Sequence, residues 1–197
     1  MWEIFKAGGP MMWPLLACSI AAFAAILERC WFFWGNGLKK DETAATRLIE
    51  SLEAGGSPQP DGGCGLISSM LRAGLSVPPE RCGKAMEVVA LEGLSRMRRG
   101  MSILDTIITA APMLGIMGTV LGIISSFDML GAAGVSDPKA VIAGIAQALI
   151  TTATGLGIAV VTIFPYNYFN FRIEQAQDQL EAYASRLELA LSARKQG

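Results

Sequence analysis

The chain has 197 residues and a formal net charge of −1, and 52% of its residues are hydrophobic while only 17% are charged. Soluble domains carry about 25% charged residues, so a large part of this surface must face something other than water. The nearly neutral charge gives no overall positive field for binding nucleic acid. Histidine, the commonest general base and metal ligand, is absent, which argues against an enzyme.

The four cysteines do not indicate a metal site. Cys18, Cys30, Cys64 and Cys82 lie 12, 34 and 18 residues apart, whereas zinc ligands normally come in pairs about two to four residues apart. A thiol in or beside an apolar run usually acts as a small hydrophobic group. We therefore expect no metal and no cofactor.

Three uncharged runs are long enough to cross a membrane. They cover residues 7–27, 106–127 and 140–171, which are 21, 22 and 32 residues long. An α-helix rises about 1.5 Å per residue and the hydrocarbon core is about 30 Å thick, so each run can form a transmembrane helix. The third would be about 48 Å long and must tilt or leave the hydrocarbon.

The first run also has the length of a signal peptide, and it contains the small-residue triplet Ala22-Phe23-Ala24. That triplet lies inside the apolar stretch, however, and the stretch is followed by a charged pair and then by aromatic residues at 31–34. An aromatic belt of this kind is typical of a helix that stays in the membrane, and we prefer that interpretation.

Basic residues predict the orientation of the three helices. Lys6 and Lys139 fall on one side of the membrane. On the other side lie the five arginines nearest the membrane, which are Arg29, Arg96, Arg98, Arg99 and Arg172. Because basic residues beside membrane helices stay in the cytoplasm, the sequence predicts an N-terminus outside the membrane and a C-terminus inside, in the cytoplasm.

The cytoplasmic segments are also expected to be helical. An amphipathic helix should begin at Asp41 as its N-cap and end before Gly55, followed by a turn-rich linker over 55–65. Apolar residues at helical spacing run from Met86 to Leu104, directly into the second span, and from Ile173 to Ala190 after the third.

These patterns together predict an all-α integral membrane protein with three transmembrane helices, the second and third extended into a cytoplasmic helical bundle. The expected parts of the chain are an outside N-terminal segment with the first transmembrane helix (1–34), a cytoplasmic helical region (35–102), the second transmembrane helix (103–130), a short external loop (131–139), the third transmembrane helix (140–171) and a cytoplasmic C-terminal helix (172–197).

Small and polar residues recur on one face of each of the last two membrane helices. On the second helix they are Asp105, Thr109, Pro112, Gly115, Thr119, Gly122 and Ser126; on the third, Gly144, Gln147, Thr151 and Thr154, beside Thr152 and Gly155. Small residues let helix backbones approach closely. The sequence predicts helix packing through Pro112, Gly115, Gly118, Gly122, Gly144 and Gly155, and packing alone would explain both faces.

The depth of two threonines suggests a further role. Thr119 lies about 13 Å below Asp128, and Thr152 lies about 22 Å below Asp137, so both are near mid-membrane on antiparallel helices. A hydroxyl group both donates and accepts hydrogen bonds, so it can solvate an ion or bind a carboxylate. We therefore select Thr119, Thr152, Thr151 and Gln147 as candidates for an ion pathway.

The motifs in these helices resemble a known family. LDTIITAAPMLGIMGTVLGIISSFDML (104–130) is similar to the second helix of the MotA/TolQ/ExbB proton channel family, closest to ExbB and TolQ. IAQALITTATGLGIAVV (145–161), followed by YNYF, is similar to their third helix, and AAILERCWFF (24–33) to the end of their first. MotA relatives have four spans, which argues against that branch.

The resemblance implies a homopentamer around an ExbD/TolR-like single-span partner whose membrane aspartate carries the proton. It also implies a bacterial inner-membrane location with a periplasmic N-terminus, and coupling of the proton-motive force to work in the cell envelope, with a TonB/TolA-like transducer as a possible further partner. Thr119 and Thr152 correspond to the threonines that line the family's channel. We expect the protein to contact the lipid bilayer and not to bind nucleic acid.

The chain departs from the family pattern at two positions. Gln147 stands where many members have glutamate, and Val161 stands at the position of their mid-helix proline, with Pro165 nearby instead. Glutamine cannot titrate, so a protonatable group at mid-membrane must come from elsewhere. A sodium-driven transducer, in which threonine oxygens bind the ion, and a non-conducting membrane scaffold remain alternatives.

Overall fold

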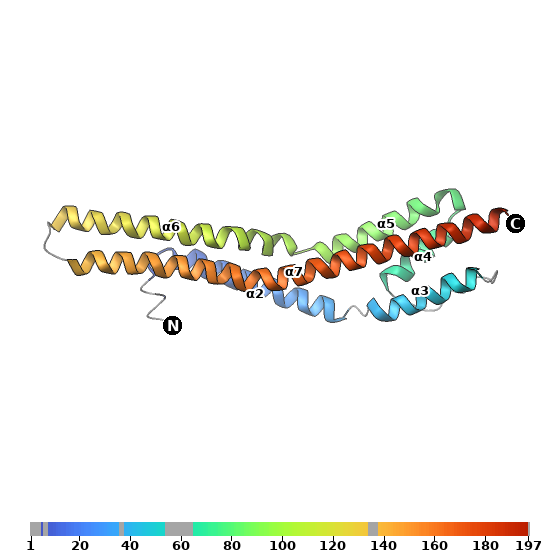
Figure 1. Cartoon of the computed structure of the whole chain (residues 1–197), viewed down its shortest axis with the longest axis horizontal. Coiled ribbons are helices and arrows are strands. Elements are labelled where there is room, and N and C mark those ends of the chain that lie inside the picture. The colour runs from blue at the N-terminus through green and yellow to red at the C-terminus, as the bar shows by residue number, and fades with distance from the viewer. Residues whose placement is uncertain (1–4, 6–7, 36–37, 54–64, 134–137, 197) are drawn as a thin grey trace. The chain divides into compact units, whose positions relative to one another are not determined.

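The computed structural model describes residues 5, 8–35, 38–53, 65–133 and 138–196. The helices in this part of the chain are α2 (Met12–Gly35), α3 (Leu38–Glu53), α4 (Leu66–Leu75), α5 (Pro79–Arg98), α6 (Met101–Ala133) and α7 (Pro138–Gln196) (Figure 1). Most of the expected 55–65 linker and the centre of the expected external loop lie outside the described residues.

Three stretches are long and apolar enough to cross a membrane. They are Met12–Phe33 and segments within Pro79–Asp128 and Ile142–Ala193. The prediction of an all-α membrane protein with three such helices is therefore confirmed. The chain forms two compact units, the first from Met1–Glu28 with Gly100–Tyr168 and the second from Arg29–Arg99 with Phe169–Gly197.

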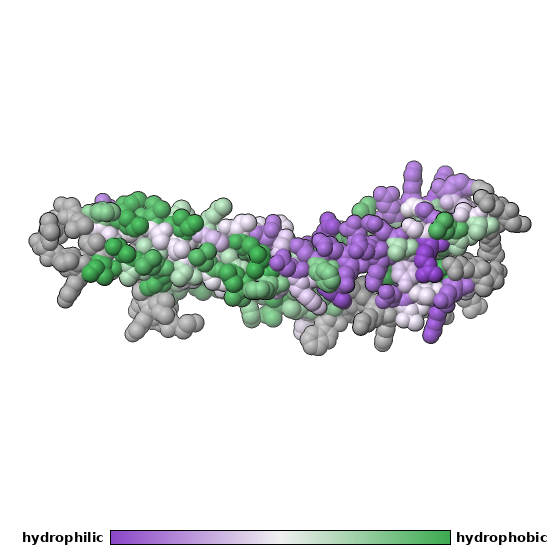
Figure 2. Space-filling view, in the orientation of Figure 1, coloured by the Kyte–Doolittle hydropathy of each residue, from purple (hydrophilic) through white to green (hydrophobic). Residues whose placement is uncertain are grey.

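The first unit contains most of α2, all of α6 and the first half of α7. A small core joins α2 to α6 through Leu15 and Ala22 on one side and Ile107 and Ala111 on the other. Figure 2 shows hydrophobic side chains gathered over α6 and the first half of α7. The larger apolar side chains of these two helices are exposed, among them Met113, Ile116, Val120, Phe127, Leu149 and Val160. An exposed apolar surface of this size is stable in lipid and costly in water.

The second unit is a helical bundle with its own core. α3, α4, α5 and the second half of α7 each contribute buried apolar side chains: Ala45, Leu48, Ile49, Ile67, Met70, Leu71, Cys82, Met86, Leu180 and Leu187. Burial, and then the nearby Glu188 carboxylate, raise the pKa of the Cys82 thiol. This cysteine therefore stays protonated and packs as a small hydrophobic group.

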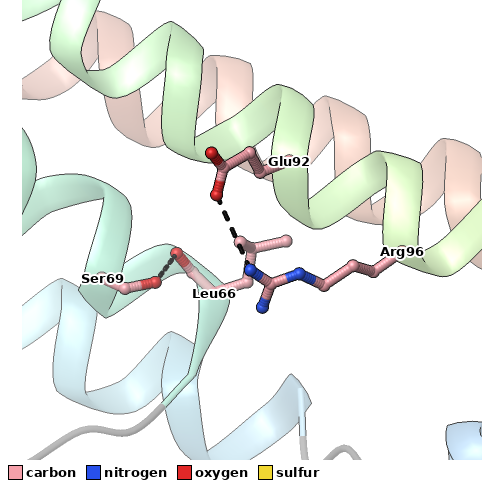
Figure 3. A network of polar contacts seen from close by, with 4 residues as sticks. All are labelled: Leu66, Ser69, Glu92 and Arg96. Atoms are coloured by element: carbon pink, nitrogen blue, oxygen red, sulfur yellow. Dashed lines mark hydrogen bonds and ion pairs between the residues drawn. The ribbon is translucent and has the colours of Figure 1, made fainter.

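Two glycines set the close packing between α4 and α5. Leu66 of α4 occupies the space that a side chain at Gly93 would need, and Gly74 of α4 faces Cys82 and Met86 in the same way. Figure 3 shows this region: Ser69 donates a 2.8 Å hydrogen bond to the Leu66 carbonyl. On the exposed side of α5, Glu92 and Arg96 pair at 3.6 Å.

The expectation that Asp41 caps its own helix is wrong. α3 begins earlier, at Leu38, and the Asp41 carboxylate instead accepts hydrogen bonds from the backbone N–H groups of Ile67 (2.7 Å) and Ser68 (3.2 Å). Gly65, the residue just before α4, has no side chain with which to cap that helix. Asp41, only 5% exposed, therefore satisfies the unpaired N-terminal groups of a neighbouring helix.

The apolar stripe expected to run unbroken from Met86 into the second span is interrupted. α5 ends at Arg98, and Gly100 then adopts a φ of 80°, which glycine reaches at little cost. Arg29 of α2, only 3% exposed, donates two 3.3 Å hydrogen bonds to the carbonyls of Arg96 and Met97. These carbonyls lack helical partners at the end of α5, so Arg29 stabilises the break. α7, in contrast, is one helix of 59 residues.

Asp41→Ala should destabilise the second unit. The change leaves buried N–H groups of α4 unpaired, and we expect the free energy of unfolding to fall by about 2 kcal/mol. Denaturant titration in mild detergent, followed by circular dichroism, measures the loss. Asp178→Ala, at an exposed position on α7, is the control and should change it by less than about 0.5 kcal/mol. Equal effects would show that the Asp41 bonds contribute nothing.

Candidate functional site

The candidate site lies where α6 and the first half of α7 pack side by side in the first unit (Figure 1). At its centre the two backbones are in contact. A Cβ atom added to Gly115 would lie 3.0 Å from the Thr152 Cα and 3.1 Å from the Thr151 carbonyl oxygen. One added to Gly155 would lie 3.2 Å from the Gly115 Cα and would collide with the Ala111 carbonyl. Only glycine permits this approach.

The contact extends towards the end of α6 and the beginning of α7, which are connected by residues 134–137. A Cβ atom at Gly122 would lie 2.9 Å from the Ala148 Cβ and 3.1 Å from the Gly144 carbonyl oxygen. A side chain at Gly144 would in turn overlap the Ser126 hydroxyl. The structure therefore brings both of these glycines into the same interface as Gly115 and Gly155.

Thr151 fills the remaining space in this interface. It is 1% exposed, its hydroxyl donates to the Ala148 carbonyl at 2.7 Å, and its side chain lies against Gly118. Thr151 thus lies between the two helices. Pro112, the other predicted packing residue, lies half-buried inside α6 without ending the helix.

The two threonines expected near mid-membrane have different partners. Thr152 donates a 2.9 Å hydrogen bond to the Gly115 carbonyl and so links α7 to α6. Thr119 donates to the Ile116 carbonyl of its own helix at 2.5 Å. Both side chains are half-buried. Each hydroxyl has used its single proton on a carbonyl, so each keeps only acceptor lone pairs for a third group.

The polar stripe expected on α6 does not form one packed face. Asp105 and Thr109 at its beginning are exposed, and the Thr109 hydroxyl bonds only to carbonyls of its own helix. From residue 111 onward, the buried positions of α6 are Ala111, Gly115, Gly118, Gly122 and Ser126. Gly118 rather than Thr119 is buried because the smallest side chain allows the closest helix approach.

Gln147 contacts the segment that precedes α2. Gly9 has a φ of 68°, and a side chain at this glycine would overlap the Gln147 amide. The neighbouring Gly8 lies near Ile150, whose Cγ2 would be 3.5 Å from an added Cβ. The structure therefore places Gln147 beside the N-terminal segment.

Two buried hydroxyl groups were not selected as site residues from the sequence. Ser126 donates to the Gly122 carbonyl at 2.8 Å and Thr162 to the Ile158 carbonyl at 2.7 Å. Thr162 follows Thr151 by 11 residues on the same helix face, since three helical turns take about 10.8 residues. Extending the spacing of three and four residues beyond Gly155, through Ile158, would have reached Thr162.

The membrane segments contain no charged side chain from 106 to 127 or from 140 to 171. Asp105 and Asp128 border the first of these segments, and both are exposed. Within the described part of the chain, no three His, Cys, Asp or Glu side chains come together as metal ligands would. The site therefore offers hydroxyl and carbonyl oxygens and no titratable carboxylate.

The fold and the site define a helical membrane protein whose uncharged spans pack closely through glycine and threonine. Comparison with known proteins is more specific, because residues 65–182 match the MotA/TolQ/ExbB proton channel family. The chain belongs to this family, and the resemblance inferred from its sequence motifs is confirmed.

Individual relatives extend the similarity over most of the chain. It is 34% identical over 194 residues to the putative biopolymer transport protein ExbB-like 1 of Synechocystis sp., covering 94% of this chain and 76% of that protein. It is 35% identical to the putative ExbB homolog of Methanothermobacter thermautotrophicus, covering 91% and 66%. It is 28% identical to TolQ of Pseudomonas aeruginosa, covering 92% and 86%. These similarities support a role in membrane energy transduction.

Gly118→Ala should weaken the helix contact. The new Cβ would lie 2.5 Å from the Thr151 hydroxyl and 2.7 Å from the Thr151 Cβ, and overpacking of this kind costs about 1–3 kcal/mol. Adding Thr151→Gly removes both obstructing atoms and should restore part of the loss. Unfolding in a detergent–denaturant titration measures each change.

Gly157→Ala on α7 is the matched control, because nothing lies within 4 Å of a Cβ atom at that position. It should leave stability unchanged or raise it by up to about 1 kcal/mol. A Gly118→Ala protein as stable as the control would mean that α6 and α7 do not pack as closely as described.

Proposed function

We propose that this chain is a ring-forming subunit of an inner-membrane proton channel or motor that couples the proton-motive force to work in the cell envelope. The observation that carries the proposal is the pairing of mid-membrane hydroxyls with spans that contain no charged side chain. Such spans can line a pathway but cannot hold the proton, so the acid must come from a partner.

The partner that fits is an ExbD/TolR-like single-span protein that supplies a membrane aspartate. We propose that several copies of this chain, most simply five, surround it, and that a TonB/TolA-like transducer carries the work outward. The N-terminus would be periplasmic and the C-terminus cytoplasmic, because Arg29, Arg96, Arg98, Arg99 and Arg172 flank the spans on one side.

The hydrogen bonds of the two threonines favour the neutral form of the partner's acid. Thr119 and Thr152 already donate to carbonyls, so each can accept the O–H of a protonated carboxyl group. A charged carboxylate would require a hydroxyl to give up its present partner. We propose that the proton therefore crosses this level on a neutral acid, which also avoids the cost of a charge at the membrane centre.

Thr151 and Gln147 have different parts in this proposal. Thr151 is buried between the helices and stabilises the packing of α6 against α7. Gln147 makes polar contacts at the outer end of the pathway and does not titrate. A sodium-driven transducer is the second candidate, because the free lone pairs of Thr119 and Thr152 could bind a cation together with carbonyl oxygens.

Substitution of valine for each threonine tests the pathway. Valine keeps the shape and removes the hydroxyl, which should cost about 1–3 kcal/mol and slow transport by about ten- to a hundredfold. Proton flux is measured in liposomes that contain the partner, with and without sodium. Thr119→Val should slow flux with little change in stability, whereas Thr152→Val should also destabilise the protein, since it removes an interhelical bond.

Thr109→Val is the control, because Thr109 is exposed and bonds only within α6. Its flux should stay within about twofold of wild type. If Thr119→Val and Thr152→Val both assemble and conduct like wild type, the threonines are packing groups and the pathway lies elsewhere. Flux that requires sodium would favour the second candidate, and no flux at all would favour a scaffold.

Thiol labelling tests the orientation. A cysteine placed at Ser76, an exposed position between α4 and α5, should react only when the reagent reaches the cytoplasm. A cysteine at position 134, in the connection between α6 and α7, should react with a reagent that cannot cross the inner membrane. The basic residues beside the spans require this result, and the opposite labelling pattern would reverse the proposed topology.

A further inference from the structure

The first uncharged run of the chain is not helical along its whole length. α2 begins at Met12, so the helix keeps 16 of the uncharged residues, those from 12 to 27. They rise about 24 Å, which is less than the hydrocarbon thickness of about 30 Å. Residues 8–11, which we call the strap, continue the run as non-helical backbone.

Non-helical backbone at membrane depth is stable only where protein covers it or where it lines a water-filled cavity. Two carbonyls of the strap have partners in the first turn of α2. The Met12 N–H donates to the Gly9 carbonyl at 3.1 Å, and the Trp13 N–H donates to the Pro10 carbonyl at 3.3 Å. Gly8 is buried, so part of the strap is covered by protein.

The side chain of Gln147 on α7 covers the strap at Gly9. A Cβ atom added to Gly9 would overlap the Gln147 amide nitrogen and would lie 2.7 Å from the Gln147 Cδ. Gly9 has a φ of 68°, which glycine reaches at little cost. Ile150, three residues further along α7, adjoins Gly8, because its Cγ2 would be 3.5 Å from a Cβ atom there. The strap and α7 therefore fit each other through two glycines.

An amide suits this position chemically. Glutamine offers two N–H donors and a carbonyl acceptor, whereas an ionised carboxylate only accepts hydrogen bonds. Backbone outside a helix presents both N–H and C=O groups that have no helical partner. An uncharged side chain that donates and accepts can satisfy either kind without bringing a charge into the membrane.

Gln147 and Thr152 lie on different sides of α7. Successive helix residues are about 100° apart, so Thr152 is about 140° around the helix from Gln147 and about 160° from Ile150. The Thr152 hydroxyl reaches the Gly115 carbonyl of α6, whereas Gln147 and Ile150 adjoin the strap. A pathway that passes the Thr152 hydroxyl is therefore not the surface that Gln147 contacts.

We propose that Gln147 docks the strap and is not part of the ion pathway. The proposal rests on the function proposed above, in which Thr119 and Thr152 meet the partner's acid, and it assigns the polar contacts of Gln147 to the strap. The strap stays docked while the ion passes, since release would expose non-helical backbone to hydrocarbon. Glutamine is sufficient at this position because docking needs an amide and no titration.

Hydrogen exchange tests the docking in the full chain in mild detergent. Gly9→Ala places a Cβ atom on the Gln147 amide, and Gln147→Leu removes the amide. Each change should speed exchange of the Met12 and Trp13 amides by about tenfold or more, because both amides donate to strap carbonyls. Ala146→Ser, at the exposed neighbouring position, is the control and should leave exchange within about twofold of wild type.

Disulfide formation tests the same contact independently. In a background with the native cysteines replaced by serine, Gly9→Cys combined with Gln147→Cys should form an intrachain disulfide on oxidation, because a side chain at Gly9 points at the Gln147 amide. A protease site inserted in the 134–137 connection separates the two fragments on a gel unless the disulfide joins them. Gly9→Cys with Ala146→Cys is the matched control and should not link, since Ala146 lies about 100° away around α7.

Proton flux in liposomes that contain the partner then separates docking from a place in the pathway. The disulfide-linked protein should conduct within about twofold of its reduced form. A flux that falls about tenfold or more on linking and returns on reduction overturns the inference, because the side of Gln147 would then belong to the pathway.

Unchanged exchange in Gly9→Ala and Gln147→Leu, or a cysteine pair that links no better than the control, also overturns the inference. Failure of the proposed function looks different. If the disulfide forms and the exchange rates rise as expected, but even the wild-type protein conducts no protons with its partner, the strap is docked on Gln147 and the function alone is contradicted.

Discussion

The contact between the backbones of α6 and α7 is the interaction on which the rest of the membrane unit depends. In lipid the hydrophobic effect does not drive helices together, so association relies on van der Waals contact and interhelical hydrogen bonds. Gly115 and Gly155 provide the contact by removing side chains from the interface, and Thr152 provides the hydrogen bond. Because the small residues occupy this face, the large apolar side chains of both helices are left on the outward faces, where lipid or another subunit can cover them.

The same close approach determines what the hydroxyl groups can do. A threonine in an uncharged span must give its proton to some acceptor, and the nearest acceptors are helix carbonyls. Thr152 reaches Gly115 on the other helix because no side chain intervenes, whereas Thr119 has to use Ile116 on its own helix. Both hydroxyl groups therefore keep only acceptor lone pairs for a further hydrogen bond. Packing and chemistry are linked here: a larger residue at Gly115 would separate the helices and also remove the acceptor for Thr152.

The sequence predicted the elements well and their partners less well. Uncharged runs of sufficient length predict three membrane helices, and small residues at helical spacing predict a close helix contact, because both are local properties. Asp41 shows the limit of local patterns. A carboxylate at a helix start suggests a cap for that helix, yet Asp41 caps α4 by accepting a hydrogen bond from Ile67, 26 residues further along the chain. The sequence pattern does not predict the break at Gly100, because the apolar spacing continues through it. The break is stabilised by Arg29, which binds the carbonyl of Arg96, 67 residues away in the sequence. The buried face of α6 contains Gly118 rather than Thr119 because its partner on α7 selects the smaller side chain.

Exposure of an apolar side chain has opposite meanings in the two units. Val120 on α6 is 51% exposed and Val88 on α5 is 58% exposed, so accessibility alone does not distinguish them. Their neighbours do. Val120 lies within 22 consecutive uncharged residues, a segment that is stable only in hydrocarbon. Val88 lies between Lys84 and Glu92 and one residue after Glu87, and these charges keep its helix out of hydrocarbon. Lipid can therefore cover Val120, whereas Val88 lies on a helix surface that faces water or another protein.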